Sequence, residues 1–224
     1  MATISTRELS GLPDVAGLER LLQSLAMLDA IYCPEWEFRY YSFNAQWSDF
    51  EQMGSMRDGS GNEFYALFNP HGCFLKGFDH EAKMSPYRTE PPSVWPGLLA
   101  GVPGVFADCL NEPAFNMRDV TFCIWRQAAD SIWQHGEIEF PPGDDPDGSI
   151  GLLSALDGNP ATYRDLAADY YADDEENQLR FELPAIDAIY RHLPLTEELV
   201  ASLNPSLSLE DLRDEATEIG YPLG

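Results

Sequence analysis

The chain has 224 residues, of which 44% are hydrophobic and 12% aromatic, a composition typical of a folded globular protein and not of a disordered one. Its 38 acidic residues outnumber its 13 basic residues, so the formal net charge is −25. Such a surface repels phosphate groups, which disfavours nucleic acid and anionic membranes as partners. A basic protein or peptide is the partner that this charge favours.

The sequence predicts a cytosolic protein with reduced cysteines. No run approaches the roughly 18 apolar residues of a membrane helix, and the N-terminus lacks the basic-then-apolar pattern of a signal peptide. The four cysteines are far apart and form no CxxC pair, so we expect them to be half-buried small hydrophobic residues. They are Cys33, Cys73, Cys109 and Cys123.

The clearest predicted helix covers residues 14–32, where leucines recur at steps of three and four and form one apolar stripe. The first apolar segment, Val15 to Ile31, is interrupted by Glu19, Arg20 and Asp29. Asp14 is suited to cap this helix and Pro34 to end it. The period then changes, because the aromatic residues Trp36, Phe38 and Tyr40 alternate with charged ones, which predicts a half-buried strand.

A hairpin follows in the next segment. Residues 58–61 form a turn rich in Gly and Ser, and residues 63–68 a short aromatic strand. The tetrapeptide 69–72, Asn-Pro-His-Gly, suits a type I turn, and residues 73–78 are the returning strand. An isolated hairpin is barely stable, so we expect an antiparallel sheet of three or more strands.

Beyond the hairpin, four prolines mark residues 84–97 as a loop. A helix is predicted for about 97–110, and a strand for 120–126, where Val, Thr, Phe, Ile and Trp favour a pleated surface. Residues 136–140 either extend this strand after a bend or belong to a loop. The strongest break in the chain is 141–148, with Pro, Gly and three Asp close together.

The final third is predicted to be helical, which makes the chain an α+β protein with an N-terminal helix before the sheet. Residues 1–224 are interpreted as one domain, whose helical part from about 149 either packs on the sheet or forms a subdomain. The expected helices lie near 160–173, 184–192, 196–203 and 208–218. Their expected starts and stop are Pro184, Thr196, Ser208 and Gly220. The acidic run 173–176 is expected to be the solvated end of a helix.

The most chemically suggestive residues are Asp79, His80 and Glu81, directly after the hairpin. On an extended chain Asp79 and Glu81 lie on one face and His80 on the other. His71, in the preceding turn, approaches His80 only if the hairpin register allows it. These residues are the weak candidates for a catalytic centre, and the two histidines for metal ligands, although a metal site needs at least three converging ligands. The alternative interpretation is a polar strand end with a hydrogen-bonded histidine.

The loop 143–148 invites comparison with a calcium-binding EF-hand through Asp144, Asp145 and Asp147. Aligning Gly148 with the obligatory glycine puts Gly143 at the first ligand position and Ser154 where a bidentate glutamate belongs, which excludes an EF-hand. The three aspartates stay candidates for a weak binding site. No other motif predicts a cofactor or a nucleophile, and the glycines of 54–61 have no following Gly-Lys-Ser/Thr and are interpreted as hairpin turns.

The aromatic residues are most simply core residues. Trp95, in its proline-rich loop, and Trp133 form a binding patch instead if Trp95 is exposed and Trp133 lies near it. Exposed aromatic residues are frequent at interface hot spots, which is why these two are candidate binding residues.

Residues 58–85, with Gly-Phe-Asp-His-Glu at 77–81, resemble a group of stand-alone bacterial proteins of unassigned function. Leu-Asn-Pro at 203–205 and Ile-Gly-Tyr-Pro at 219–222 extend this resemblance to the tail. The resemblance implies no activity. In size, acidity and α+β order the chain is also similar to immunity proteins that neutralise toxins, including the SMI1/KNR4-like superfamily, by analogy only.

Three functions are consistent with these observations. The first is a non-enzymatic, acidic, immunity-like protein that docks a basic partner, such as a toxin or nuclease, by charge complementarity. The second is a small hydrolase, metal-dependent or not, centred on Asp79, His80 and Glu81, which requires these side chains to converge. The third is a module that recognises a small molecule through its aromatic residues.

Overall fold

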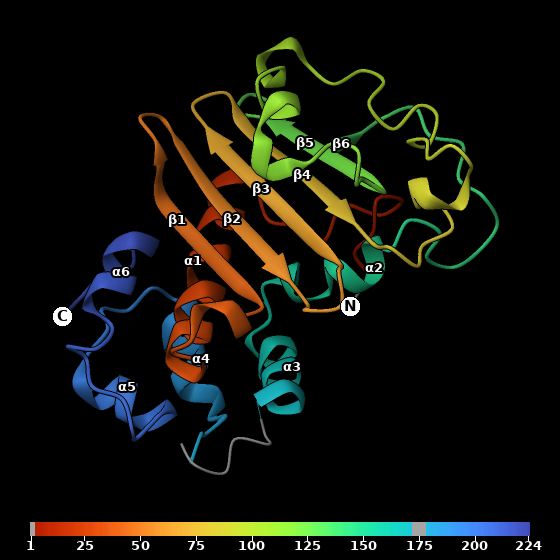
Figure 1. Ribbon diagram of the computed structural model, residues 1–224. Helices are drawn as coiled ribbons and strands as arrows, with labels where there is room; N and C mark the ends of the chain where they lie inside the picture. Colours follow the sequence, from red (N-terminus) through yellow and green to blue (C-terminus); the bar gives the residue numbers. More distant parts are fainter. Residues whose placement is uncertain (1–2, 172–177) are drawn as a thin grey trace.

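The computed structural model describes residues 3–171 and 178–224, and in these residues a long helix precedes an antiparallel sheet and a group of shorter helices (Figure 1). This confirms the predicted α+β class. The helices are α1 (Val15–Tyr32), α2 (Ser149–Leu152), α3 (Pro160–Tyr171), α4 (Leu183–Tyr190), α5 (Glu197–Leu203) and α6 (Arg213–Ile219). Short 3₁₀ helices are η1 (Trp36–Phe38), η2 (Pro86–Arg88), η3 (Gly104–Phe106), η4 (Cys109–Asn111), η5 (Pro113–Phe115) and η6 (Ser154–Asp157).

The sheet is a meander whose strands pair in the order of the chain. The strands of the described residues are β1 (Tyr41–Ser48), β2 (Glu51–Arg57), β3 (Glu63–Asn69), β4 (Gly72–Phe78), β5 (Phe122–Gln127) and β6 (Gln134–His135). The predicted hairpin is confirmed, because Phe68 pairs with Cys73 across the turn and Glu63 with Phe78 at the other end. The predicted strand at 120–126 is confirmed as β5, which adds to β4 across the long segment 79–121.

Both faces of the sheet are covered, one by helices and one mainly by the segment between β4 and β5 (Figure 1). Alternation along the strands divides the side chains between these layers. Ala66 and Leu75 face α1 and the C-terminal helices. Leu67 and Phe74, their neighbours in sequence, face the segment 79–121.

Helix α1 forms where the leucine pattern predicts it. The Asp14 carboxylate accepts a hydrogen bond of 2.8 Å from the Gly17 N–H, which confirms the predicted cap. The helix packs against β1 and β2 on one side and against α4, α5 and α6 on others, so most of its residues are buried. No helix in residues 3–171 and 178–224 is both long enough and apolar enough to span a membrane.

The strand predicted at residues 36–40 is wrong. The segment forms the 3₁₀ turn η1 instead, and Trp36 and Phe38 are about half exposed. Arg39 explains the difference, because its buried guanidinium donates to the carbonyl oxygens of Cys33 and Pro34, each at 2.7 Å, and pairs with Glu215 at 2.8 Å. These bonds fold the segment back on the end of α1.

Strands β1 and β2 were not predicted, and the interpretation of Gly54 as part of a turn is wrong. Gly54 lies inside β2, opposite Phe43 and Ala66. A Cβ atom at this position would lie 2.8 Å from Leu22 Cδ1, so glycine allows β2 to approach α1 closely.

The predicted helix at about 97–110 is also wrong, because only η3 and the start of η4 form there. Residues 136–140, for which either a strand or a loop was expected, form a loop after the short β6.

The C-terminal helices form close to the predicted positions. The Thr196 hydroxyl accepts from the Leu199 N–H at 3.2 Å, and Gly220 ends α6 with a φ of +75°, which confirms both predicted boundaries. Helix α6 begins at Arg213, later than expected, because Ser208 and Asp211 close a separate turn. The acidic run 173–176 lies outside the described residues. The described C-terminal helices bury apolar side chains in the same cluster as α1.

Candidate functional site

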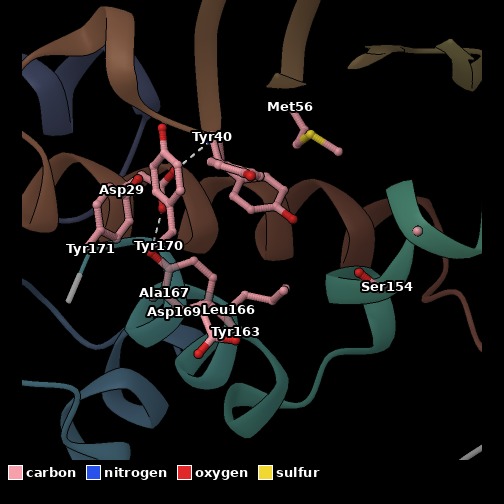
Figure 2. Close-up of a pocket in the computed structure, with 12 residues that line it drawn as sticks. Asp29, Tyr40, Met56, Ser154, Tyr163, Leu166, Ala167, Asp169, Tyr170 and Tyr171 are labelled. Carbon is pink, nitrogen blue, oxygen red and sulfur yellow. Dashed lines mark hydrogen bonds between the residues drawn. The ribbon is translucent and has the colours of Figure 1, made fainter. Parts of the chain in front are cut away.

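A pocket of about 310 Å³ lies between α1, α3, the start of β1 and the segment around α2 and η6 (Figure 2). This volume is at the lower end of the range of small-ligand sites in proteins. Its walls consist mainly of tyrosine rings and aliphatic side chains, with a carboxylate from α1. The lining residues include Asp29, Tyr40, Tyr41, Met56, Tyr163, Leu166, Ala167, Asp169, Tyr170 and Tyr171. We call this site the Asp29 pocket.

Asp29 is the most unusual of these residues, because its side chain is only 1% exposed. One carboxylate oxygen accepts a hydrogen bond of 2.6 Å from the Tyr41 N–H, and the other accepts one of 2.5 Å from the Tyr163 hydroxyl. The fold therefore supplies two donors from distant parts of the chain to hold this group. No Lys, Arg or His nitrogen of the described residues lies within ion-pair distance of it.

Burial raises the pKa of Asp29 to about 6, because removing a carboxylate from water disfavours its charged form. The hydrogen bonds from Tyr163 and Tyr41, and the nearby Tyr171 hydroxyl, lower the pKa and offset part of this effect. The positive charge of Arg39 lowers it less, since that guanidinium is bonded elsewhere. Asp29 is consequently a buried acid that changes its charge near pH 6 and contacts no counter-ion in the part of the chain that the structure describes.

Tyrosines surround this carboxylate on several sides. The ring centroids of Tyr41 and Tyr163 are 6.3 Å apart, and Tyr40 meets Tyr170 edge to face at 4.4 Å. The buried Tyr171 hydroxyl also lies near Asp29, and its interaction with the carboxylate lowers the pKa of Asp29. Burial and the nearby Asp29 carboxylate both raise the pKa of Tyr171 and of Tyr163, so these hydroxyls stay protonated.

The charged side chains that line the pocket are both acidic, the buried Asp29 and a residue at its opening. Asp169, an exposed residue of α3, adds a second carboxylate to the lining, and no lysine, arginine or histidine contributes among the described lining residues. Tyrosine faces carry negative potential at the ring centre, which attracts cations. This combination of a buried carboxylate with aromatic walls is suited to an ammonium or guanidinium group.

The structure does not bring Asp79, His80 and Glu81 together as a catalytic centre. Asp79 caps a turn, since its carboxylate accepts from the N–H groups of Glu81 and Ala82 at 2.8 and 3.0 Å. His80 is exposed, and its Nδ1 lies 2.7 Å from Asn62 Oδ1. Glu81 is exposed as well. This geometry gives no support to a hydrolase built on these residues.

His71 does not approach His80. The two residues lie at opposite ends of β4, whose seven residues span about 20 Å at the usual rise of a strand. The register leaves His71 in the exposed turn and His80 beside the next loop. Within the described residues, no group of three or more His, Cys, Asp or Glu side chains is placed to hold a metal ion.

The three aspartates of the 143–148 loop serve the local fold. Asp145 accepts from the N–H groups of Ile150 and Gly151 at 3.1 and 3.2 Å, at the start of α2. Asp147 is buried and accepts from Ser149 Oγ at 2.7 Å and from the Thr6 hydroxyl. The Asp144 side chain is exposed, and its backbone carbonyl accepts from Arg7. The Asp145 and Asp147 carboxylates lie close together, since burial first and then the neighbouring Asp147 raise the pKa of Asp145. The described residues add no third carboxylate that would make this pair a metal site.

Trp95 and Trp133 lie in different layers and do not form a joint patch. Trp133 is buried in the layer of α1, where its Nε1 donates to the Pro13 carbonyl at 2.6 Å. Trp95 packs on the layer formed by the segment 79–121 and donates to the Glu139 carbonyl at 3.2 Å.

The Asp29 pocket was not predicted from the sequence, although one signal for it was present. Asp29 follows Leu25 by four residues, so this aspartate falls on the apolar stripe of α1.

Comparisons with protein-family models, with curated proteins and with solved structures found no match to this chain. The functional argument therefore depends on the geometry of the α+β fold and of its pockets.

Proposed function

We propose that this chain is a non-enzymatic binding protein that docks a basic protein or peptide, and that the Asp29 pocket receives a cationic side chain of that partner. The observation that carries the proposal is the buried Asp29 carboxylate, which lacks a contacting counter-ion among the described residues and lies in a tyrosine-walled pocket. Binding is favoured over catalysis because the sequence contains no recognisable catalytic motif.

The charge of the chain supports the same partner class. With a net charge of −25, the protein attracts a basic partner over a distance of several ångströms and accelerates its approach. Two of the basic side chains, Arg39 and Lys76, are buried in ion pairs with Glu215 and Glu63 and so expose no positive charge of their own. Long-range attraction brings the basic partner to the surface, and the pocket then makes a specific contact with it.

The energetics of Asp29 also favour a cationic ligand. An ionised carboxylate without a counter-ion is costly in a buried site, and a bound ammonium removes much of that cost. An ammonium in the pocket would meet the remaining lone pairs of Asp29 and the faces of the tyrosine rings that line the pocket. Binding should therefore strengthen as pH rises through about 6, where Asp29 becomes ionised.

The test is titration of the protein with a fluorescently labelled lysine-rich peptide, measured by anisotropy at low salt and at about 0.3 M salt. We expect binding that weakens with salt and that Asp29→Asn reduces about tenfold. Asp49→Asn, which removes the same charge from an exposed turn remote from the pocket, is the matched control and should have little effect.

A second variant guards against a change in folding. Leu166 lines the pocket and is 42% exposed, so Leu166→Arg places a competing cation at the pocket without altering the hydrogen bonds of Asp29. It should weaken binding as Asp29→Asn does. Equal binding by all four proteins, or equal binding of a peptide with glutamine in place of lysine, would contradict the proposal.

A further inference from the structure

A second and smaller pocket lies on the opposite face of β1 and β2, with a volume of about 190 Å³. Most of its lining comes from one face of the sheet, where Ser42 of β1 pairs with Ser55 of β2, and Ser55 pairs with Tyr65 of β3. We call this site the Arg57 pocket. Its principal lining residues are Trp36, Ser42, Trp47, Ser55, Arg57 and Tyr65.

Two polar atoms of this lining are buried without a hydrogen-bond partner among the described residues, Arg57 Nη2 and Ser42 Oγ. A buried donor that makes no hydrogen bond costs free energy, so an acceptor in the pocket would recover that cost. No carboxylate of the described residues lies within 4.0 Å of the Arg57 guanidinium, although the chain has 38 acidic residues. Within residues 3–171 and 178–224 the guanidinium therefore has no ion-pair partner.

Aromatic rings flank this guanidinium. The Arg57 Cζ atom lies 4.2 Å from the centroid of the Trp36 ring, a cation–π contact that holds the arginine in place. Trp36 is 52% exposed and Trp47 39%, whereas Trp125 and Trp133 are buried. Two exposed indole rings beside a fixed arginine provide flat apolar surface next to a charged donor.

We propose that the Arg57 pocket binds a small aromatic carboxylate. The carboxylate accepts from Arg57 Nη2 and from the Ser42 hydroxyl, and the aromatic ring packs between the indoles and Tyr65. Arg is suited to this role because its planar fork matches a carboxylate. The pocket volume fits a ligand with one ring.

The nearby acids have partners of their own. Glu63 pairs with Lys76 at 2.8 Å, and Glu218, which lines the pocket, accepts from Asn44 Nδ2 at 3.3 Å. Lys76 adds a buried positive charge 5.4 Å from the Tyr65 ring. The proposal is independent of the Asp29 pocket, which lies on the other face and prefers the opposite charge.

The test is titration of the protein with benzoate, followed by the indole N–H signals of the tryptophans in NMR spectra. Benzylammonium, which has the same ring and the opposite charge, is the matched ligand. For a ligand of this size we expect a Kd of about 1 mM, with shifts confined to Trp36 and Trp47, and no shift of these two signals with benzylammonium.

Variants decide whether Arg57 carries the binding. Arg57→Met should weaken benzoate binding about tenfold or more, and Arg118→Met, which removes the same charge from an exposed site, should change it less than about twofold. Trp36→Ala should weaken binding while the urea unfolding midpoint stays close to that of the parent. Benzoate binding that is equal in Arg57→Met and Arg118→Met, or shifts of Trp36 and Trp47 with an acidic peptide but none with benzoate, would overturn the proposal.

Discussion

The Asp29 pocket and the Arg57 pocket lie on opposite faces of the same two strands, and each offers a charged group that has no contacting counter-ion among the described residues. Strand alternation produces this pair, because Tyr41 and Met56 face the helices whereas Ser42 and Arg57 face the other side. The charged groups differ in their support. Asp29 is held by two hydrogen bonds inside the core, whereas Arg57, the last residue of β2, is held by one ring.

The two pockets differ in how deeply the layers packed on each face of the sheet bury them. Helices α1 and α3 enclose the Asp29 pocket, so its charge strongly affects the stability of the fold. The segment 79–121 covers Leu67 and Phe74 of the central strands. On that face, Ser42 and Ser55 of β1 and β2 stay only partly buried. We therefore expect large effects on stability from the first pocket and small ones from the second.

The largest expected effect is the dependence of stability on the charge of Asp29. Because its pKa is about 6 in the folded protein and near 3.8 in an unfolded chain, the folded state holds the proton more tightly between these values. This stabilisation is present at pH below 4 and is lost as pH rises through 6, a change on the order of 3 kcal/mol.

Urea unfolding of the parent and of Asp29→Asn from pH 4 to pH 8 measures this effect. The free energy of unfolding of the parent should fall relative to that of the variant across this window. Parallel curves would show that Asp29 titrates normally and would remove the contrast between the two pockets.

The next effect concerns the Tyr163 hydroxyl. Tyr163→Phe removes the donor to one Asp29 oxygen, so we expect a loss of about 2 kcal/mol in the free energy of unfolding at pH 7. The pKa of Asp29 should also rise, because the lost hydrogen bond favours the charged form. Urea unfolding and carboxyl NMR titration check the two parts separately. Tyr190→Phe, which removes a buried hydroxyl without a hydrogen-bond partner among the described residues, is the control and should lose less.

The smallest effect is expected at the Arg57 pocket. Arg57→Met and Trp36→Ala each remove the contact between the guanidinium and an indole that is half exposed, which is worth about 0.5–1 kcal/mol. The thermal unfolding midpoint should therefore move by only a few degrees in either variant. A loss as large as that of Tyr163→Phe would mean that this pocket belongs to the core and would break the comparison.

Local patterns in the sequence predicted the elements that depend on local chemistry. The hairpin of β3 and β4 follows from its Asn-Pro-His-Gly turn and alternating side chains, and α1 from its leucines and the Asp14 cap. Strands β1 and β2 were missed because polar residues and Gly54 hide their pairing. Gly54 is explained only by the close approach of Leu22.

Both candidate sites depend on contacts between distant residues, which no local pattern shows. Burial raises the pKa of Asp29, and hydrogen bonds from Tyr163 and Tyr41 offset part of that rise; Tyr163 is 134 residues away in the chain. Arg57 meets Trp36 only because η1 folds back beside the edge strand. The position of Asp29 on the apolar stripe of a helix is visible in the sequence and indicates a buried acid. Its hydrogen-bond partners could not be named without the fold.

The most direct test of the cation-binding account is the pKa of Asp29 measured by carbon NMR of its carboxyl group, with and without saturating lysine-rich peptide. A bound ammonium favours the ionised form, so the account predicts a pKa near 6 in the free protein and a fall of about one unit or more in the complex. A pKa that is the same with and without bound peptide would contradict it, because the cationic side chain would then lie outside the pocket.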